Sequence, residues 1–271
     1  MTVTKTTFPS TLSPTPPART GPRLNRRWLA GLGSAAGALL LWEAVARFSG
    51  LPAFLLPPPA RVWARLLDLL SDGTLWRHTQ VTLLEVGAGL SAGLAVATVL
   101  GYVIAKSPTL ERALTPYIVA SQSVPVVAIA PLLVLWLGPG LLSKVVVCAL
   151  IVFFPMLVNT VVGLRSVAPE LRDLMRALNA TRWQTFVKLE VPAALPVLFG
   201  GLKIGATLAV VGAVVGEFVG ADRGLGFLVN LGRGQYDTAL VFVAVGALVA
   251  LALGLYGAVT LLERRLLRWK R

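Results

Sequence analysis

Residues 169–196 read PELRDLMRALNATRWQTFVKLEVPAALP and form a polar segment between two long apolar runs. Pro169 suits the first turn of a helix. The helical spacing i, i+3, i+4, i+7 then gives one apolar stripe, made of Leu171, Leu174, Met175 and Leu178. Asn179 follows at the point where a left-handed cap is needed, and Asn tolerates that conformation. The pattern predicts a short amphipathic helix that ends at Asn179.

The second half of this segment predicts another short helix. Thr181 and Gln184 have the spacing of a capping box, and Trp183 and Phe186 supply an apolar side. Pro192 and Pro196 are expected to close the element before the next span. Two interpretations stay open at this point. The pair of helices either packs beneath a membrane bundle or presents a docking helix to a groove on another protein.

The flanking sequence has the composition of a membrane protein. Hydrophobic residues make up 56% of the 271 residues and charged residues 14%, whereas soluble proteins carry about 25% charged residues. A spanning helix needs about 20 predominantly apolar residues. Six segments meet this condition, so we predict an all-α, polytopic membrane protein with spans at about 29–48, 83–105, 114–137, 142–164, 196–219 and 238–262. The third of these is expected to be a broken helix lining the bundle interior, because it contains Pro116, Pro125 and Pro131.

The net charge of +13 sets the orientation. With both termini in the cytoplasm, 17 basic residues lie inside, and five lie outside, namely Arg61, Arg65, Arg77, Arg223 and Arg233. This asymmetry follows the positive-inside rule, so a nucleic-acid partner is not expected. Residues 1–23 are predicted to be a disordered cytoplasmic tail. Arg26 and Arg27, followed by an apolar stretch and Ala44-Val-Ala46, leave a cleaved signal peptide open as an alternative.

Between the first two expected spans, residues 50–80 form the longest loop. Val62, Leu66 and Leu69 recur there at helical spacing, with Arg61 and Arg65 on the other side. This pattern predicts an amphipathic helix on the outer surface. The single Cys148 and single His78 exclude a disulfide within the chain, a cysteine metal site and a multi-histidine metal site.

The polar segment resembles the cytoplasmic EAA loop of binding-protein-dependent ABC importer permeases. In that motif, Glu-Ala-Ala is followed by three residues, Gly, nine residues, Ile, one residue and Leu-Pro. Asp173 falls on the Glu, Asn179 on the Gly and Leu189 on the Ile, while Val191 and Pro192 take the final pair. Leu174 and Met175 replace the two alanines, so the first helix is bulkier than the motif.

Other segments look like the nitrate, sulfonate and taurine type of this family. They are the run from Ser123 to Lys144, Phe154-Pro155 with Asn159-Thr160, and Glu217 followed by Gly224-Leu-Gly226. The resemblance covers residues 50–265. It implies a type I importer fold, a homodimer in the bacterial inner membrane, ATPase subunits docked on the loop at 165–195, and an extracytoplasmic solute-binding protein.

The same resemblance implies a non-catalytic subunit with no cofactor of its own, since ATP would bind the partner. The chain has no Gly-Lys pair and therefore no phosphate-binding loop. A small anion such as nitrate, a sulfonate or taurine is the expected solute, with a pyrimidine precursor or a riboflavin-like vitamin as alternatives. The implied coupling-loop residues are Leu171, Asp173, Leu174, Met175, Leu178, Asn179, Trp183, Phe186 and Pro192.

Polar residues inside the spans are candidates for the translocation path, because such groups are costly in a bilayer and serve packing or function. They are Gln122, Ser123, Asn159, Thr160 and Glu217. Glu217 is also placed to brace Gly224–Gly226. An ion-coupled secondary transporter remains the alternative function. Against it, Glu43, Glu85 and Glu217 are all expected near span ends rather than at mid-membrane.

Overall fold

The computed structural model describes residues 24–268, which contain helices and no strand. The chain divides into two units, one ending at Gly50 and the other beginning at Leu51. In the first unit, helix α1 (Leu24–Phe48) covers the expected first span, and Glu43 pairs with Arg47 one turn later. The predicted tail at residues 1–23 lies outside the described residues.

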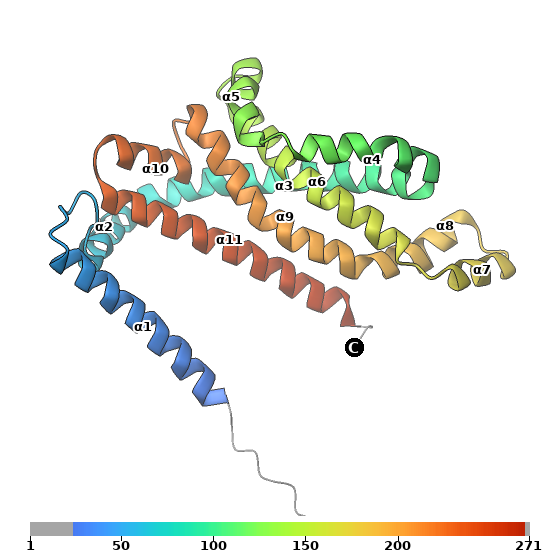
Figure 1. Ribbon diagram of the computed structural model, residues 1–271, viewed down its shortest axis with the longest axis horizontal. Coiled ribbons are helices and arrows are strands. Elements are labelled where there is room, and N and C mark those ends of the chain that lie inside the picture. Colours follow the sequence, from blue (N-terminus) through green and yellow to red (C-terminus); the bar gives the residue numbers. More distant parts are fainter. Residues whose placement is uncertain (1–23, 269–271) are drawn as a thin grey trace, which may run out of the picture. The chain divides into compact units, whose positions relative to one another are not determined.

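The second unit is built around three long helices, α3 (Thr74–Lys106), α6 (Leu141–Arg165) and α9 (Val191–Gly220). Helix α6 packs along both of the others (Figure 1). Small residues allow this close approach, as is usual between membrane helices. A Cβ atom added at Gly93 of α3 would lie 2.7 Å from the Ala149 carbonyl oxygen, and one added at Gly212 of α9 would lie 2.8 Å from the Cys148 Cα.

Among residues 24–268, four helices are long and apolar enough to cross a membrane on their own. They are α3, α6, the continuous helix at 182–220, and α11 (Thr238–Leu266). A bent pair of helices, α4 (Pro108–Gln122) and α5 (Val126–Leu137), makes a fifth. Together with α1, this arrangement is compatible with the six spans expected from the sequence.

The second span begins nine residues earlier than expected. Helix α3 starts at Thr74, directly after the left-handed Gly73, and runs through the expected loop residues 74–80. Arg77 and His78 are tolerated because they lie in the first turns, where Arg77 bonds back to the Asp72 carbonyl. As a consequence, Glu85 lies well inside the helix and is buried.

The third span is broken, as its prolines predicted. Helices α4 and α5 meet at 89° around Ser123, Val124 and Pro125. The expectation that this pair lines the interior of the bundle is wrong for the single chain. Helix α4 has no buried residue and α5 has only Ala130, so most of both surfaces is exposed.

Three further elements lie at the end of the second unit where α3 begins. They are α2 (Pro59–Ser71), α10 (Leu225–Gly234) and the start of α11. Leu69, Leu225, Leu228 and Leu240 form a small apolar core between them. The inter-span loop, residues 165–195, lies at the opposite end and contains α7 (Pro169–Ala177) and α8 (Arg182–Thr185) (Figure 1).

Candidate functional site

Helix α7 contacts the bundle through Arg172. The Arg172 guanidinium donates a hydrogen bond of 2.8 Å to the Leu164 carbonyl at the end of α6. Arg172 and Arg176 also line a hollow of about 820 Å³ together with Tyr102 and Glu190. A helix packed beneath the bundle through its apolar stripe would bury that stripe, whereas α7 contains no buried residue.

Three of the four residues of the predicted apolar stripe are exposed. Leu171, Leu174 and Leu178 are 45%, 53% and 67% exposed, and Trp183 of α8 is 71% exposed. We call these four residues the leucine–tryptophan patch. Exposed large apolar side chains in one loop are typical of a protein interaction surface.

The turn between the two loop helices is rigidly specified. Asn179 adopts a left-handed φ of 49°, as predicted. The Asn179 N–H donates to the Arg176 carbonyl at 2.9 Å and the Ala180 N–H to the Met175 carbonyl at 3.0 Å, the paired bonds of a Schellman cap. The predicted capping box of Thr181 and Gln184 is also confirmed, with both of its hydrogen bonds present.

The second loop helix does not end before the next span. Helix α8 continues through a π-helical turn, η1 (Phe186–Glu190), directly into α9, so that residues 182–220 form one helix. The expectation that Pro192 and Pro196 close the element is therefore wrong. Pro192 has no N–H, and in a regular α-helix its ring would clash with the carbonyl four residues earlier. The wider turn of η1 changes that spacing just before the proline.

The remaining predicted loop residues make contacts within the loop or with α3. Asp173 pairs with Arg176 at 2.7 Å on the exposed surface of α7. Met175 is half-buried. The Phe186 ring lies edge-on to Tyr102, with 5.1 Å between ring centroids, and thereby joins η1 to the end of α3.

Two of the five path candidates are helix-packing residues in this chain. The Asn159 amide donates to the Pro155 carbonyl at 2.8 Å, and the Thr160 hydroxyl donates to the Met156 carbonyl at 2.7 Å, both within α6. Asn159 fills the space beside Gly201 of α9, and Thr160 fills the space beside Gly101 of α3. Gln122 and Ser123 are exposed at the break between α4 and α5.

Glu217 lies in a buried network that seats the N-terminus of α10. Its carboxylate accepts hydrogen bonds from the Gly226 N–H, from the Phe227 N–H at 3.3 Å and from the Thr82 hydroxyl at 2.6 Å. Thr82 in turn accepts from the Leu225 N–H at 2.8 Å. Helix N-termini favour negative charge because their first N–H groups are unsatisfied. The bracing of Gly224–Gly226 by Glu217, expected from the sequence, is present.

Glycine is required at the mouth of this network. Gly224 has a φ of +114°, and a Cβ atom there would overlap the Glu217 carboxylate. The Gly224 N–H also lies 3.0 Å from the His78 Nδ1 atom.

A second buried pair joins α3 to α6 and was not predicted as a site. Lys144 of α6 is 3.9 Å from the Glu85 carboxylate of α3 and donates to the Pro139 carbonyl at 2.9 Å. Both side chains are almost fully buried. The spacing of Thr82 and Glu85 at i, i+3 on one helix face is the sequence signal that could have revealed this polar face. It was missed because the span was expected to begin at residue 83.

Residues 89–268 match the family described as the binding-protein-dependent transport system inner membrane component. The chain belongs to this family of ABC transport permeases. The riboflavin transport system permease protein RibX of Chloroflexus aurantiacus is 48% identical to this permease, over 86% of this chain and 87% of the relative. The formylaminopyrimidine transport permease protein ThiX of Halalkalibacterium halodurans is 38% identical, over 86% and 92% of the two chains.

More distant relatives include the taurine transport system permease protein TauC of Escherichia coli. It is 32% identical to this permease, over 91% of each chain. The family accounts for the multi-pass architecture and for a role in ATP-driven transport of a small solute. It favours that role over the ion-coupled alternative, and no enzyme family is indicated.

Proposed function

We propose that this permease binds an ATPase subunit through the leucine–tryptophan patch on its cytoplasmic inter-span loop. The single observation that carries the proposal is the exposure of the three leucines on a helix whose Arg172 is bonded to the bundle. An apolar helix face presented in this way fits a groove on a partner protein. Both chain termini then lie on the cytoplasmic side, and ATP is held by the partner rather than by this chain.

The loop is stiff enough to transmit motion into the membrane. Its second helix is continuous with α9, and its first helix is bonded to the end of α6. A displacement of the patch by the ATPase would therefore move α6 and α9 as bodies, which is a domain-rotation switch between inward- and outward-facing states. The Lys106–Glu190 ion pair adds α3 to the same moving group.

The permease acts in this proposal as a homodimer with a solute-binding protein on the opposite side. The exposed apolar surface of α4 and α5 supports a second copy, because Tyr117, Val127 and Leu135 are 73%, 59% and 76% exposed. A second copy seated there would enclose the break at Ser123, so Gln122 and Ser123 are our path candidates. In the dimer, α4 and α5 would lie in the interior, whereas in the single chain they lie on the surface.

We further propose a flat heterocyclic vitamin or precursor as the solute, in preference to the small anion expected from the sequence. The relatives named for riboflavin and formylaminopyrimidine are more similar than the one named for taurine. The charges of the spans agree with this choice. Lys144 is paired with Glu85, and Lys203 is paired with Glu263 at 2.5 Å, so neither lysine is free to attract an anion.

The docking proposal is tested by replacing Leu178 with Glu in the chain co-expressed with its ATPase. Loss of a central interface anchor costs about 2 kcal/mol or more, so ATPase binding should weaken by about 30-fold. Ala177→Glu is the matched control, because it adds the same charge one residue earlier on a different face of α7. Equal loss of binding in both variants, or unchanged uptake in Leu178→Glu, would overturn the role of the patch.

The solute is tested separately by uptake into cells that express the permease, the ATPase and the neighbouring binding protein. We expect ATP-dependent uptake of riboflavin or formylaminopyrimidine and none of taurine. Uptake of taurine alone would show that the solute is a small anion, and it would not affect the docking proposal.

A further inference from the structure

Helix α2 carries three parallel stripes of different chemistry. Residues 61, 65 and 68 are Arg, Arg and Asp; residues 62, 66 and 69 are Val, Leu and Leu; residues 63, 67 and 70 are Trp, Leu and Leu. Each set has the spacing i, i+4, i+7 and so runs along one line of the helix. Since consecutive residues are rotated by about 100°, the charged stripe and the tryptophan stripe lie on nearly opposite flanks.

The middle stripe faces protein. Leu69 is buried, and Val62 and Leu66 pack with it against the core formed by α10 and α11. The tryptophan stripe has no such cover, since Trp63, Leu67 and Leu70 are 64%, 49% and 55% exposed. A soluble surface would not be expected to show three large apolar side chains in line.

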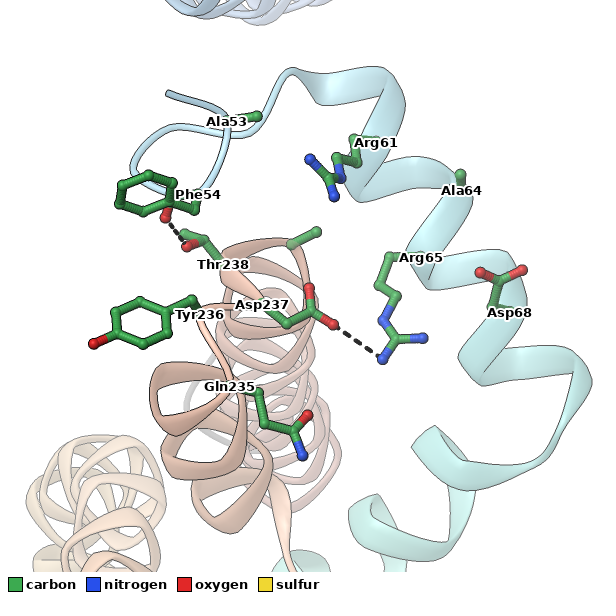
Figure 2. A pocket seen from close by; sticks show the side chains of 11 residues that line it. Ala53, Phe54, Arg61, Ala64, Arg65, Asp68, Gln235, Tyr236, Asp237 and Thr238 are labelled. Carbon is green, nitrogen blue, oxygen red and sulfur yellow. Dashed lines mark hydrogen bonds and ion pairs between the residues drawn. The ribbon is translucent and has the colours of Figure 1, made fainter. Parts of the chain in front are cut away.

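The charged stripe faces an aqueous pocket. Arg61 and Arg65 point from α2 toward the turn between α10 and α11, and Arg65 pairs with Asp237 there at 3.0 Å (Figure 2). The pocket has a volume of about 470 Å³. The Thr238 hydroxyl donates to the Phe54 carbonyl across the same opening. These contacts place the charged flank of α2 on a polar pocket, away from the tryptophan stripe.

The direction of α2 fits the surface of a bilayer. In Figure 2, α2 runs across the view while α11, a spanning helix, is seen nearly end-on. Helix α2 therefore crosses the spans instead of continuing them. It ends at Ser71, only three residues before the span α3 begins at Thr74, so it lies at the level where the spans leave the membrane. Trp76, 63% exposed, marks the same level on α3, as aromatic residues do at membrane interfaces.

We propose that α2 rests in the bilayer interface, with Trp63, Leu67 and Leu70 inserted among the lipids and Arg61, Arg65 and Asp68 in water. The partner is the lipid itself, at the boundary of headgroups and acyl chains, where amphipathic helices of this kind bind. Through Arg65 and Asp237, the anchored helix holds the α10–α11 turn at the membrane surface. This inference is independent of the ATPase docking and of the solute.

The test is spin labelling of the full-length chain in nanodiscs of phosphatidylethanolamine and phosphatidylglycerol. Cys148 is the only cysteine of the chain and is buried, so Cys148→Ala gives a background without reactive thiols. Labels are placed at Leu67→Cys and Leu70→Cys on the tryptophan stripe, and, as controls that line the pocket, at Arg61→Cys, Ala64→Cys and Asp68→Cys. Collisions with molecular oxygen report lipid exposure, and collisions with a nickel chelate report water.

We expect the ratio of oxygen to nickel collisions to exceed one at residues 67 and 70 and to fall below one at residues 61, 64 and 68. Nickel-accessible labels on both sides would overturn the proposal by showing a helix in water. Protection of residues 67 and 70 from both reagents would overturn it by showing that protein covers this flank.

A second measurement needs no label. Lipids brominated close to the headgroup should quench tryptophan fluorescence less in Trp63→Phe than in the unmodified chain, because one quenched tryptophan is removed. An equal absolute loss of fluorescence intensity in the two proteins would contradict insertion of Trp63, even where a labelled variant failed to fold.

Discussion

Removing the Glu217 carboxylate should release the N-terminus of α10. In Glu217→Ala, the Thr82 hydroxyl can turn to the His78 carbonyl, which lies 3.3 Å away, but the Gly226 and Phe227 N–H groups lose their acceptor. A buried polar group left without a partner costs about 1–3 kcal/mol, so two of them cost about 2–6 kcal/mol. The long bond from Phe227 places the expected loss near the lower half of that range, at about 3 kcal/mol.

Glu217→Gln should be much milder. Its carbonyl oxygen can still accept from the Gly226 N–H, and its amide can donate to the Thr82 hydroxyl once that hydroxyl turns to His78. Only the extra strength of a charged acceptor is lost, which is about 1 kcal/mol. The ordering Ala worse than Gln is thus a consequence of hydrogen-bond geometry rather than of charge.

Unfolding can be followed through the reactivity of Cys148. Its thiol is buried and is the only one in the chain, so a thiol-reactive fluorophore reports unfolding as the protein is heated. With about 2–4 °C per kcal/mol for a chain of this size, Glu217→Ala should melt roughly 6–12 °C lower and Glu217→Gln roughly 2–4 °C lower.

Glycine variants give the matched control for the same network. Gly224→Ala would drive a Cβ atom into the Glu217 carboxylate, whereas Gly220→Ala would place one 3.5 Å from Val134, an ordinary contact. Equal melting temperatures for Glu217→Ala and the unmodified chain, or for the two glycine variants, would refute the reasoning that α10 is seated on this carboxylate.

Three further outcomes are expected in the same melting assay or in transport. Gly93→Val should lower the melting temperature, because overpacking against Ala149 costs about 1–3 kcal/mol. Gly87→Val should leave the melting temperature unchanged, because position 87 points into open space. Equal effects of the two variants would contradict the close α3–α6 contact. Lys144→Met should lower the stability of the protein by about 3–5 kcal/mol, because it leaves Glu85 unpaired. The double variant with Glu85→Gln should recover most of that loss. No recovery would show that the two residues are not coupled. Asn179→Gly should leave solute uptake unchanged, while Asn179→Val should reduce it, because a β-branched residue disfavours the left-handed conformation of the cap. The reverse order would show that the cap is not needed for transport.

The local features of the inter-span loop were predictable because short-range chemistry dictates them. The helix start at Pro169, the left-handed cap at Asn179 and the capping box of Thr181 and Gln184 depend on neighbours within a few residues. The number and type of the main helices followed from apolar run length in the same way. The break at Pro125 also followed, since proline acts on the backbone beside it.

The tertiary structure decided what distant residues do for one another. Whether Pro192 ends a helix or is carried through a π-helical turn depends on the span that continues beyond it. That α7 turns its leucines outward depends on the bond from Arg172 to the end of α6. Glu85 looked like a span-end residue because composition alone cannot place a helix start among polar residues, whereas Glu217 does lie in the last turn of α9. Only packing showed that Glu85 faces Lys144 and that Thr82 of α3 joins the Glu217 network, since contacts between residues more than fifty positions apart leave no periodic trace in the chain.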